Sequence, residues 1–106
     1  MTAEDLQRVL PEIVRRLRRA LRPERIYLFG SCAYGTPGSD SDVDLLVIMP
    51  STQRPADRQA AVGRFLRPRP CPIDVLVRTP DEVQKAKEQG DPFITEILKR
   101  GKVLFG

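Results

Sequence analysis

Apolar residues recur at helical spacing through the first part of the chain. Residues three and four positions apart share one face of a helix, so this spacing predicts an amphipathic helix. The residues of the apolar stripe are Leu6, Leu10, Ile13, Leu17 and Leu21. Thr2 and Asp5 resemble a capping box at its start. Pro11 either kinks this helix or begins a second one at its first turn.

Short apolar runs follow, separated by polar and turn-forming segments. Three of them predict strands, with the sequences RIYLF (25–29), DLLVIM (44–49) and IDVLV (73–77), and KVLF near the C-terminal end predicts a fourth, short strand.

Helices are expected between and after these strands. Residues 55–66 favour one helix. Thr79, followed by proline and then Glu82, marks the start of the next helix, and Asp91 followed by proline starts another that ends before Gly101. The alternation of helices and strands predicts an α/β (α+β) fold, a small mixed sheet flanked by helices.

Length and composition narrow the class of protein. The chain has 106 residues, of which 41% are hydrophobic, so we expect a single domain over residues 1–106 with a core of its own. There is no histidine, which excludes a histidine-based general base, a catalytic triad with histidine and a histidine zinc site. The cysteines, Cys32 and Cys71, lack CxxC spacing and are interpreted as unpaired thiols of a reducing compartment.

The N-terminus has no signal-peptide core, and the longest apolar run, LLVIM, is too short to cross a bilayer. These two features predict a cytoplasmic protein that does not contact a membrane.

The net charge of +4 comes mostly from arginine. On the first predicted helix, arginines fall opposite the apolar stripe, at positions 8, 15, 16, 18, 19 and 22. Such an arc is either a solvated face or a docking face for an acidic partner or RNA. No aromatic residues alternate with these arginines, so direct nucleic-acid binding has no further support in the sequence.

The segment with candidate chemistry is LFGSCAYGTPGSDSDVDLLVI, residues 28–48. Asp42 and Asp44 share a face of the second strand if that strand begins by residue 42. Asp74 has the same phase in the third strand and joins them if the two strands are neighbours. Three carboxylates gathered in this way repel one another, and a hard divalent cation such as Mg²⁺ relieves that repulsion.

The turn near the start of this segment, before the aspartates, supplies a second half of the site. Gly30 follows the first strand, and Ser31 offers a hydroxyl and backbone N–H groups at the start of a short helix, which favours an anionic group such as phosphate. Ser41 either hydrogen-bonds the loop or contacts a phosphate. The combination indicates a nucleoside triphosphate bound with metal, and phosphoryl or nucleotidyl transfer requires little beyond positioning and charge neutralisation.

Gly30-Ser31, ten residues and then Asp42-x-Asp44 resemble the signature of the DNA polymerase β-like nucleotidyltransferase superfamily, and IDVLV is similar to the strand with its third aspartate. The chain is similar to the stand-alone minimal nucleotidyltransferases over nearly its full length. The resemblance implies the polymerase β-like fold. It also implies that Gly30 and Ser31 bind the triphosphate, that Asp42 and Asp44 hold two Mg²⁺ ions, and that Asp74 binds one of them and acts as the base.

Minimal nucleotidyltransferases of this type pair with a small helical HEPN toxin. The resemblance therefore implies an antitoxin that transfers AMP from ATP to a tyrosine hydroxyl of that toxin. One position departs from the pattern: Tyr34 stands where many members have arginine. Arg78 or an arginine of the first helix is a candidate to replace that charge.

Two other functions stay open. A non-catalytic antitoxin would neutralise its partner sterically with the arginine-rich helix or a sheet edge, an interpretation that Tyr34 favours and the three aspartates disfavour. Transfer to a small molecule such as an aminoglycoside would require an acceptor pocket formed with another domain or a second copy.

Overall fold

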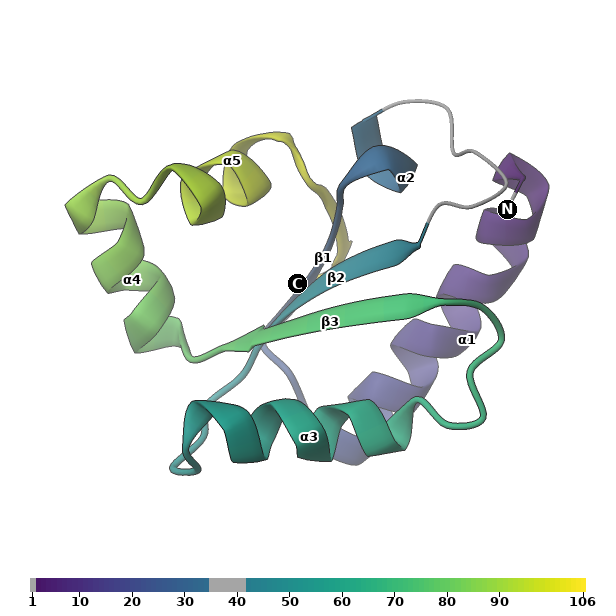
Figure 1. Cartoon of the computed structure of the whole chain (residues 1–106), viewed down its shortest axis with the longest axis horizontal. Coiled ribbons are helices and arrows are strands. Elements are labelled where there is room, and N and C mark those ends of the chain that lie inside the picture. The colour runs from purple at the N-terminus through teal and green to yellow at the C-terminus, as the bar shows by residue number, and fades with distance from the viewer. Residues whose placement is uncertain (1, 35–41) are drawn as a thin grey trace.

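The computed structural model describes residues 2–34 and 42–106 (Figure 1). In these residues the elements follow in the order α1 (Ala3–Leu21), β1 (Arg25–Phe29), α2 (Ser31–Tyr34), β2 (Val43–Ile48), α3 (Pro55–Phe65), β3 (Ile73–Arg78), α4 (Pro80–Gln89), α5 (Pro92–Arg100) and β4 (Lys102–Phe105). Every element expected from the sequence is present, with ends that differ by no more than a residue or two.

The strands form one mixed sheet in the order β3-β2-β1-β4. β1 is antiparallel to both β2 and β4, whereas β2 and β3 are parallel. Parallel neighbours require a crossover connection, and α3 provides it. The predicted α/β (α+β) class with a small mixed sheet is confirmed.

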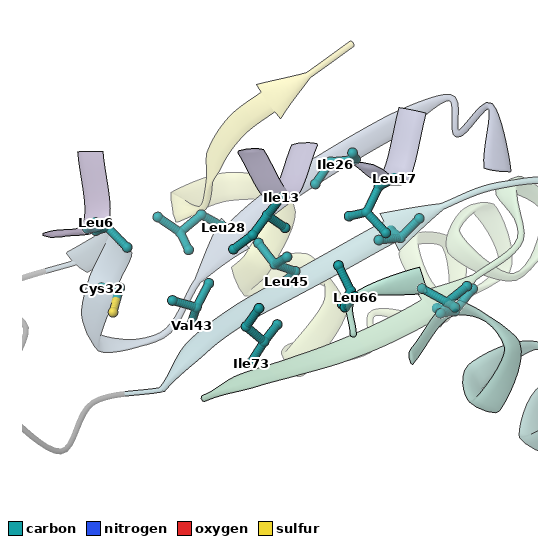
Figure 2. Close-up of a cluster of buried hydrophobic side chains, with 13 residues drawn as sticks. Leu6, Ile13, Leu17, Ile26, Leu28, Cys32, Val43, Leu45, Leu66 and Ile73 are labelled. Carbon is teal, nitrogen blue, oxygen red and sulfur yellow. The ribbon is translucent and has the colours of Figure 1, made fainter. Parts of the chain in front are cut away.

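Helices cover both faces of the sheet (Figure 1). α1 and α3 pack on one face, where Ile13, Leu17 and Leu66 are fully buried against alternate residues of the strands. Figure 2 shows this cluster, with Leu6 and Cys32 together at the end where α2 lies. α4 and α5 cover the other face, where Val83 and Ile97 are buried with Leu46. The strand residues alternate between the two clusters, as the period of two in β structure requires.

The helix ends follow the expected capping residues. The side chain of Thr2 accepts a hydrogen bond from the N–H of Asp5 at 3.1 Å, which with its reciprocal partner forms the capping box of α1. Pro11 lies inside α1, which runs on to Leu21, so the alternative of a second helix beginning at Pro11 is wrong. α4 begins with a capping box from Thr79, and α5 begins with Asp91 as its N-cap.

One arginine of α1 departs from the expected solvated arc. Arg16 is partly buried, and its guanidinium donates to the carbonyls of Leu66 at 3.3 Å and Pro68 at 2.7 Å. It thereby ties α1 to the segment that joins α3 to β3. The five other arginines of the arc, at positions 8, 15, 18, 19 and 22, are exposed.

Side chains rather than another strand occupy the outer edge of β3. The amide of Gln59 on α3 donates to the carbonyl of Val75 and accepts from the N–H of Val77, the latter at 3.0 Å. Arg69 donates to the carbonyl of Ile73 at 2.7 Å. These contacts satisfy backbone groups that an edge strand otherwise leaves open to another chain.

No helix in the described residues is both long enough and apolar enough to cross a membrane.

Candidate active site

The sheet register places two predicted site residues directly beside each other. In the parallel pair β2–β3, Asp44 is the register partner of Asp74, and neighbouring strands lie about 4.8 Å apart. Leu46 and Leu76, two residues further along each strand, belong to the cluster under α4 and α5. Because residues two apart share a face, Asp44 and Asp74 lie on that same face of the sheet.

Asp42 lies just outside the sheet. β2 begins at Val43, one residue later than the sequence argument required. The carbonyl of Asp42 accepts a hydrogen bond from the thiol of Cys32 on α2 at 3.3 Å, and the N–H of Val43 donates to the carbonyl of Pro72 at 2.9 Å. These contacts fix the chain at the entrance to β2, so Asp42 is held close enough to Asp44 for its charge to act on that carboxyl, although it is not a strand residue.

The carboxylates interact unfavourably with one another. Partial burial raises the pKa of the Asp44 carboxyl above its ordinary value, and the negative charges of Asp74 and Asp42 raise it further. None of the three aspartates forms an ion pair within residues 2–34 and 42–106. Several carboxylates that lack a basic partner provide the oxygen ligands that Mg²⁺ prefers. In the described residues, no three acidic or cysteine side chains surround a common metal position. The aspartates therefore fit Mg²⁺ in their charge and in the type of their donor atoms.

Gly30 forms a tight turn against Asp44. Its φ of 76° lies in the left-handed region that favours glycine, and its carbonyl accepts from the N–H groups of Ala33 and Tyr34 at 3.0 and 3.2 Å, which starts α2. A Cβ at Gly30 would overlap the Oδ2 of Asp44 and lie 3.1 Å from its Cγ. The turn and the carboxylate therefore pack together, as expected for one site. Ser31 is the first residue of α2 and is exposed.

A guanidinium that sequence reasoning missed reaches the short helix after this turn from α5, where it is also ion-paired with Glu96 at 2.8 Å. The guanidinium of Arg100 lies over the ring of Tyr34, 4.7 Å from its centroid. The ring of Phe93 on α5 meets the ring of Phe29 edge-on at 5.7 Å, and Phe29 is the register partner of Asp44. α5 is thus attached to the end of the sheet that holds the aspartates. No local signal in the sequence connects Arg100 to Tyr34.

Other sequence candidates lie elsewhere. Arg78 is at the far end of β3, paired with Ile48 and about 13 Å along the strand from Asp74, so it does not replace the missing arginine near the turn. Ser41, the third candidate nucleotide contact, lies outside the described residues.

The cysteines, predicted to be unpaired, are both free thiols. Burial raises the pKa of both Cys32 and Cys71, which keeps them protonated and weakly reactive.

Comparisons with known proteins agree with this geometry. A model of the nucleotidyltransferase domain matches residues 10–104. A solved structure from Sulfolobus solfataricus that is assigned as a nucleotidyltransferase has 30% sequence identity and a TM-score of 0.61, with 77% of each chain covered. A chain in the structure of the toxin–antitoxin pair MntA–HepT has 20% identity and a TM-score of 0.59, with 94% of this chain and 72% of that chain covered.

No curated protein sequence gave a significant match. The family model spans most of the residues from α1 to β4, including the Gly30 turn and all three aspartates. The chain therefore belongs to the nucleotidyltransferase domain family, within the polymerase β-like superfamily whose signature its sequence resembles.

Proposed function

We propose that this domain transfers AMP from ATP, in the presence of Mg²⁺, to a hydroxyl group of a partner protein, and that the acceptor is a tyrosine of a HEPN-type toxin. The observation that supports this function best is the register that pairs Asp44 with Asp74 beside the Gly30 turn, in a chain of the nucleotidyltransferase family.

Asp42, Asp44 and Asp74 are the residues that would hold Mg²⁺. When bound, Mg²⁺ supplies positive charge that offsets the carboxylates and the triphosphate. Asp44 is the most enclosed of the three, because Gly30 packs against its carboxylate, whereas Asp42 and Asp74 are exposed. Asp44 therefore anchors the site, and the two exposed carboxylates face the substrates.

The triphosphate is assigned to the side of the site formed by the Gly30 turn. Ser31 follows Gly30 at the start of α2, and its hydroxyl and the backbone N–H groups there favour an anionic group such as phosphate. Arg100, held over Tyr34, supplies positive charge at the position where many family members use an arginine from the turn itself. A guanidinium suits this role because it stays charged and donates several hydrogen bonds to phosphate oxygens.

The acceptor is assigned to the side of the site formed by Asp74. Asp74 is exposed on β3, and β3 is the outermost strand at this end of the sheet order. In the proposed reaction the acceptor oxygen forms a bond to the α-phosphorus of ATP, and the bond from that phosphorus to the oxygen bridging to the β-phosphate breaks. The acceptor proton passes to the Asp74 carboxylate, and pyrophosphate leaves.

A folded protein is a suitable acceptor because the site is open. Both Asp42 and Asp74 are exposed, so a side chain on the surface of another protein can reach them. The fold is also similar to that of a chain in the MntA–HepT toxin–antitoxin structure over 94% of this chain. This similarity supports a toxin as the acceptor in preference to a small molecule.

The test uses ATP labelled in the α-phosphate, Mg²⁺, purified protein and a lysate of its own host. Asp42→Asn is compared with Asp57→Asn, which makes the same change on an exposed residue of α3. We expect wild type and Asp57→Asn, but not Asp42→Asn, to label one protein band, and mass spectrometry to find AMP on a tyrosine. Label on RNA or on a small molecule would contradict the protein acceptor, and neutralisation of the partner without transfer by wild type and Asp42→Asn alike would favour a steric antitoxin.

A further inference from the structure

A cavity of about 390 Å³ lies along the outer edge of β3, beside Asp74. It is bounded by α3 and by the segment from α3 to β3, which Figure 1 shows rising next to the start of β3. Its lining includes three arginines, Arg64, Arg67 and Arg69, together with Asp74. Asp74 thus belongs both to the carboxylate site and to this cavity.

The cavity has an excess of positive charge. Asp74 is the one acidic residue among the described residues that line it, against three arginines. None of these arginines forms an ion pair within the described chain, whereas Arg8, Arg15 and Arg16 of α1 are each paired with a carboxylate. Arg64 and Arg67 are exposed, so their guanidinium groups are available to a ligand.

The edge of β3 is closed to a strand from another protein. Gln59 occupies the backbone groups of Val75 and Val77, and Arg69 occupies the carbonyl of Ile73. A ligand therefore contacts this cavity through its side chains, since few outward backbone groups are left to pair with it. The arginine side chains then determine what is recognised, and they select negative charge.

The lining also distinguishes between anionic ligands. Apart from the charged residues it consists of Gln59, Ala60, Gly63, Ile73 and Val75, with no aromatic ring. Single-stranded nucleic acids are usually bound through stacking of bases on aromatic side chains, which this cavity does not offer. Acidic side chains need only the guanidinium groups.

We propose that this cavity binds acidic residues that flank the acceptor hydroxyl in the partner protein. The inference rests on the proposed function in one respect, the role of Asp74 as the group that receives the acceptor proton. The arginines and Asp74 line the same cavity, so an acceptor segment that reaches Asp74 from the outer edge of β3 also comes within reach of the arginines. Acidic flanking residues would hold that segment in place while its hydroxyl faces the carboxylate.

The experiment measures binding and transfer separately. Two synthetic peptides have one central tyrosine, flanked by glutamates in one and by lysines in the other, with a fluorescent label at one end. Binding is measured by fluorescence anisotropy with no ATP, and transfer is measured with α-labelled ATP and Mg²⁺. The variant Arg64→Glu/Arg67→Glu is compared with wild type and with Arg15→Glu/Arg19→Glu, which reverses two exposed arginines of α1.

We expect wild type to bind the acidic peptide about tenfold more tightly than the basic one, since each exposed charge pair contributes modestly and several act together. Arg64→Glu/Arg67→Glu should lose this preference, and the α1 variant should keep it. Arg64→Gln/Arg67→Gln should give an intermediate preference, and unchanged melting temperatures would show that all variants fold.

Equal binding of both peptides, or an equal loss in the α1 variant, would overturn the inference. A single-stranded oligonucleotide that displaces the acidic peptide at lower concentration than the peptide itself would also overturn it, in favour of nucleic acid. Failure of the proposed function is distinguishable, because it would remove transfer to both peptides and leave the anisotropy preference intact.

Discussion

The guanidinium of Arg100 lies over the ring of Tyr34, so the last turn of α5 contacts the short helix that follows the Gly30 turn. The resemblance to the superfamily signature implies an arginine at the position of Tyr34 in many members, and here a guanidinium from another element lies against the ring of that residue. The guanidinium of Arg100, which is also ion-paired with Glu96 at 2.8 Å, therefore lies beside the short helix of the candidate triphosphate site.

Arg100→Ala should weaken binding of ATP with Mg²⁺ about tenfold, which corresponds to about 1.4 kcal/mol for one charged hydrogen-bond donor at an exposed site. Arg100→Lys should restore part of the affinity, because it keeps the charge but not the planar donor group. Isothermal titration with ATP and Mg²⁺ gives the affinities. Arg15→Ala, which removes an equally exposed and ion-paired arginine of α1, should have no effect.

The ring of Tyr34 provides a second test of the same contact. Tyr34→Phe keeps the aromatic face and should bind ATP as wild type does. Tyr34→Leu removes the cation–π contact, worth about 0.5–1 kcal/mol at an exposed site, and should weaken ATP binding by about two- to fivefold. Equal loss in both variants would mean that the hydroxyl, and not the ring, is what matters at this position.

Gly30→Ala should damage the site more than the fold. The left-handed φ of 76° and the overlap of a Cβ with Asp44 Oδ2 both oppose a side chain here. We expect the free energy of unfolding to fall by about 1–2 kcal/mol and AMP transfer to fall by at least ~10-fold as the Asp44 carboxylate is displaced.

Gly90→Ala is the matched control for this change. Gly90 has a similar φ of 71°, but a Cβ there meets no atom within 4 Å. It should lose stability through the left-handed φ alone, and so no more than Gly30→Ala in urea unfolding, with transfer activity unchanged. If Gly90→Ala lost as much activity as Gly30→Ala, the contact with Asp44 would not be the cause.

Asp44→Asn should stabilise the protein in the absence of Mg²⁺ and abolish transfer. Burial and the charges of Asp74 and Asp42 disfavour the ionised carboxylate, so a neutral amide of the same shape removes that repulsion. We expect a higher melting temperature in chelator for Asp44→Asn than for wild type. Addition of Mg²⁺ should raise the melting temperature of wild type and of Asp57→Asn, but not that of Asp44→Asn. A lower melting temperature of Asp44→Asn in chelator would contradict the repulsion argument.

Most of the helices and strands could be predicted from the sequence, because they depend on local periodicity. Alternation along β2 and β3 was enough to assign Asp44 and Asp74 to one face, once the two strands were assumed to be neighbours. The capping residues Thr2, Thr79 and Asp91 marked the beginnings of three helices through chemistry confined to a single turn. The exact end of a strand is harder to predict from periodicity, and Asp42, which the sequence argument required in the strand, lies one residue before β2.

Contacts between distant segments could not be predicted. Arg100 reaches Tyr34 only because α5 packs against the sheet. Arg16 is partly buried, unlike the other arginines of the arc, because its guanidinium donates hydrogen bonds to carbonyls of a distant segment. In sequence both residues resemble ordinary surface arginines. The close approach of Gly30 to Asp44 likewise depends on the pairing of β1 with β2.

The ion pair between Arg58 and Glu82 provides a test of stability against pH. Arg58 on α3 is buried and pairs with the partly exposed Glu82 on α4, which also accepts from the N–H of Thr79 at 2.8 Å. The hydrogen bond from Arg58 holds the pKa of Glu82 below its ordinary value of 4.5. A carboxylate with a lowered pKa stabilises the fold above its unfolded-state pKa, and this stabilisation is lost as the pH falls through the folded-state pKa.

Glu82→Gln should therefore lower the free energy of unfolding at pH 7 by about 2 kcal/mol, less than for a fully buried pair because Glu82 is partly exposed. The difference from wild type should stay constant down to the ordinary pKa of 4.5 and shrink below it. Arg58→Met should cost less, because Glu82 can reach water and still cap α4, whereas Glu82→Gln leaves a buried guanidinium without its counterion. Asp81→Asn, which breaks the exposed pair with Lys85, should change stability by less than ~0.5 kcal/mol. Urea unfolding at pH 7 and at lower pH values, through 4.5, gives the free energies of unfolding of wild type and of the three variants. A difference between wild type and Glu82→Gln that grew on acidification would show that the direction assigned to the pKa shift of Glu82 is wrong.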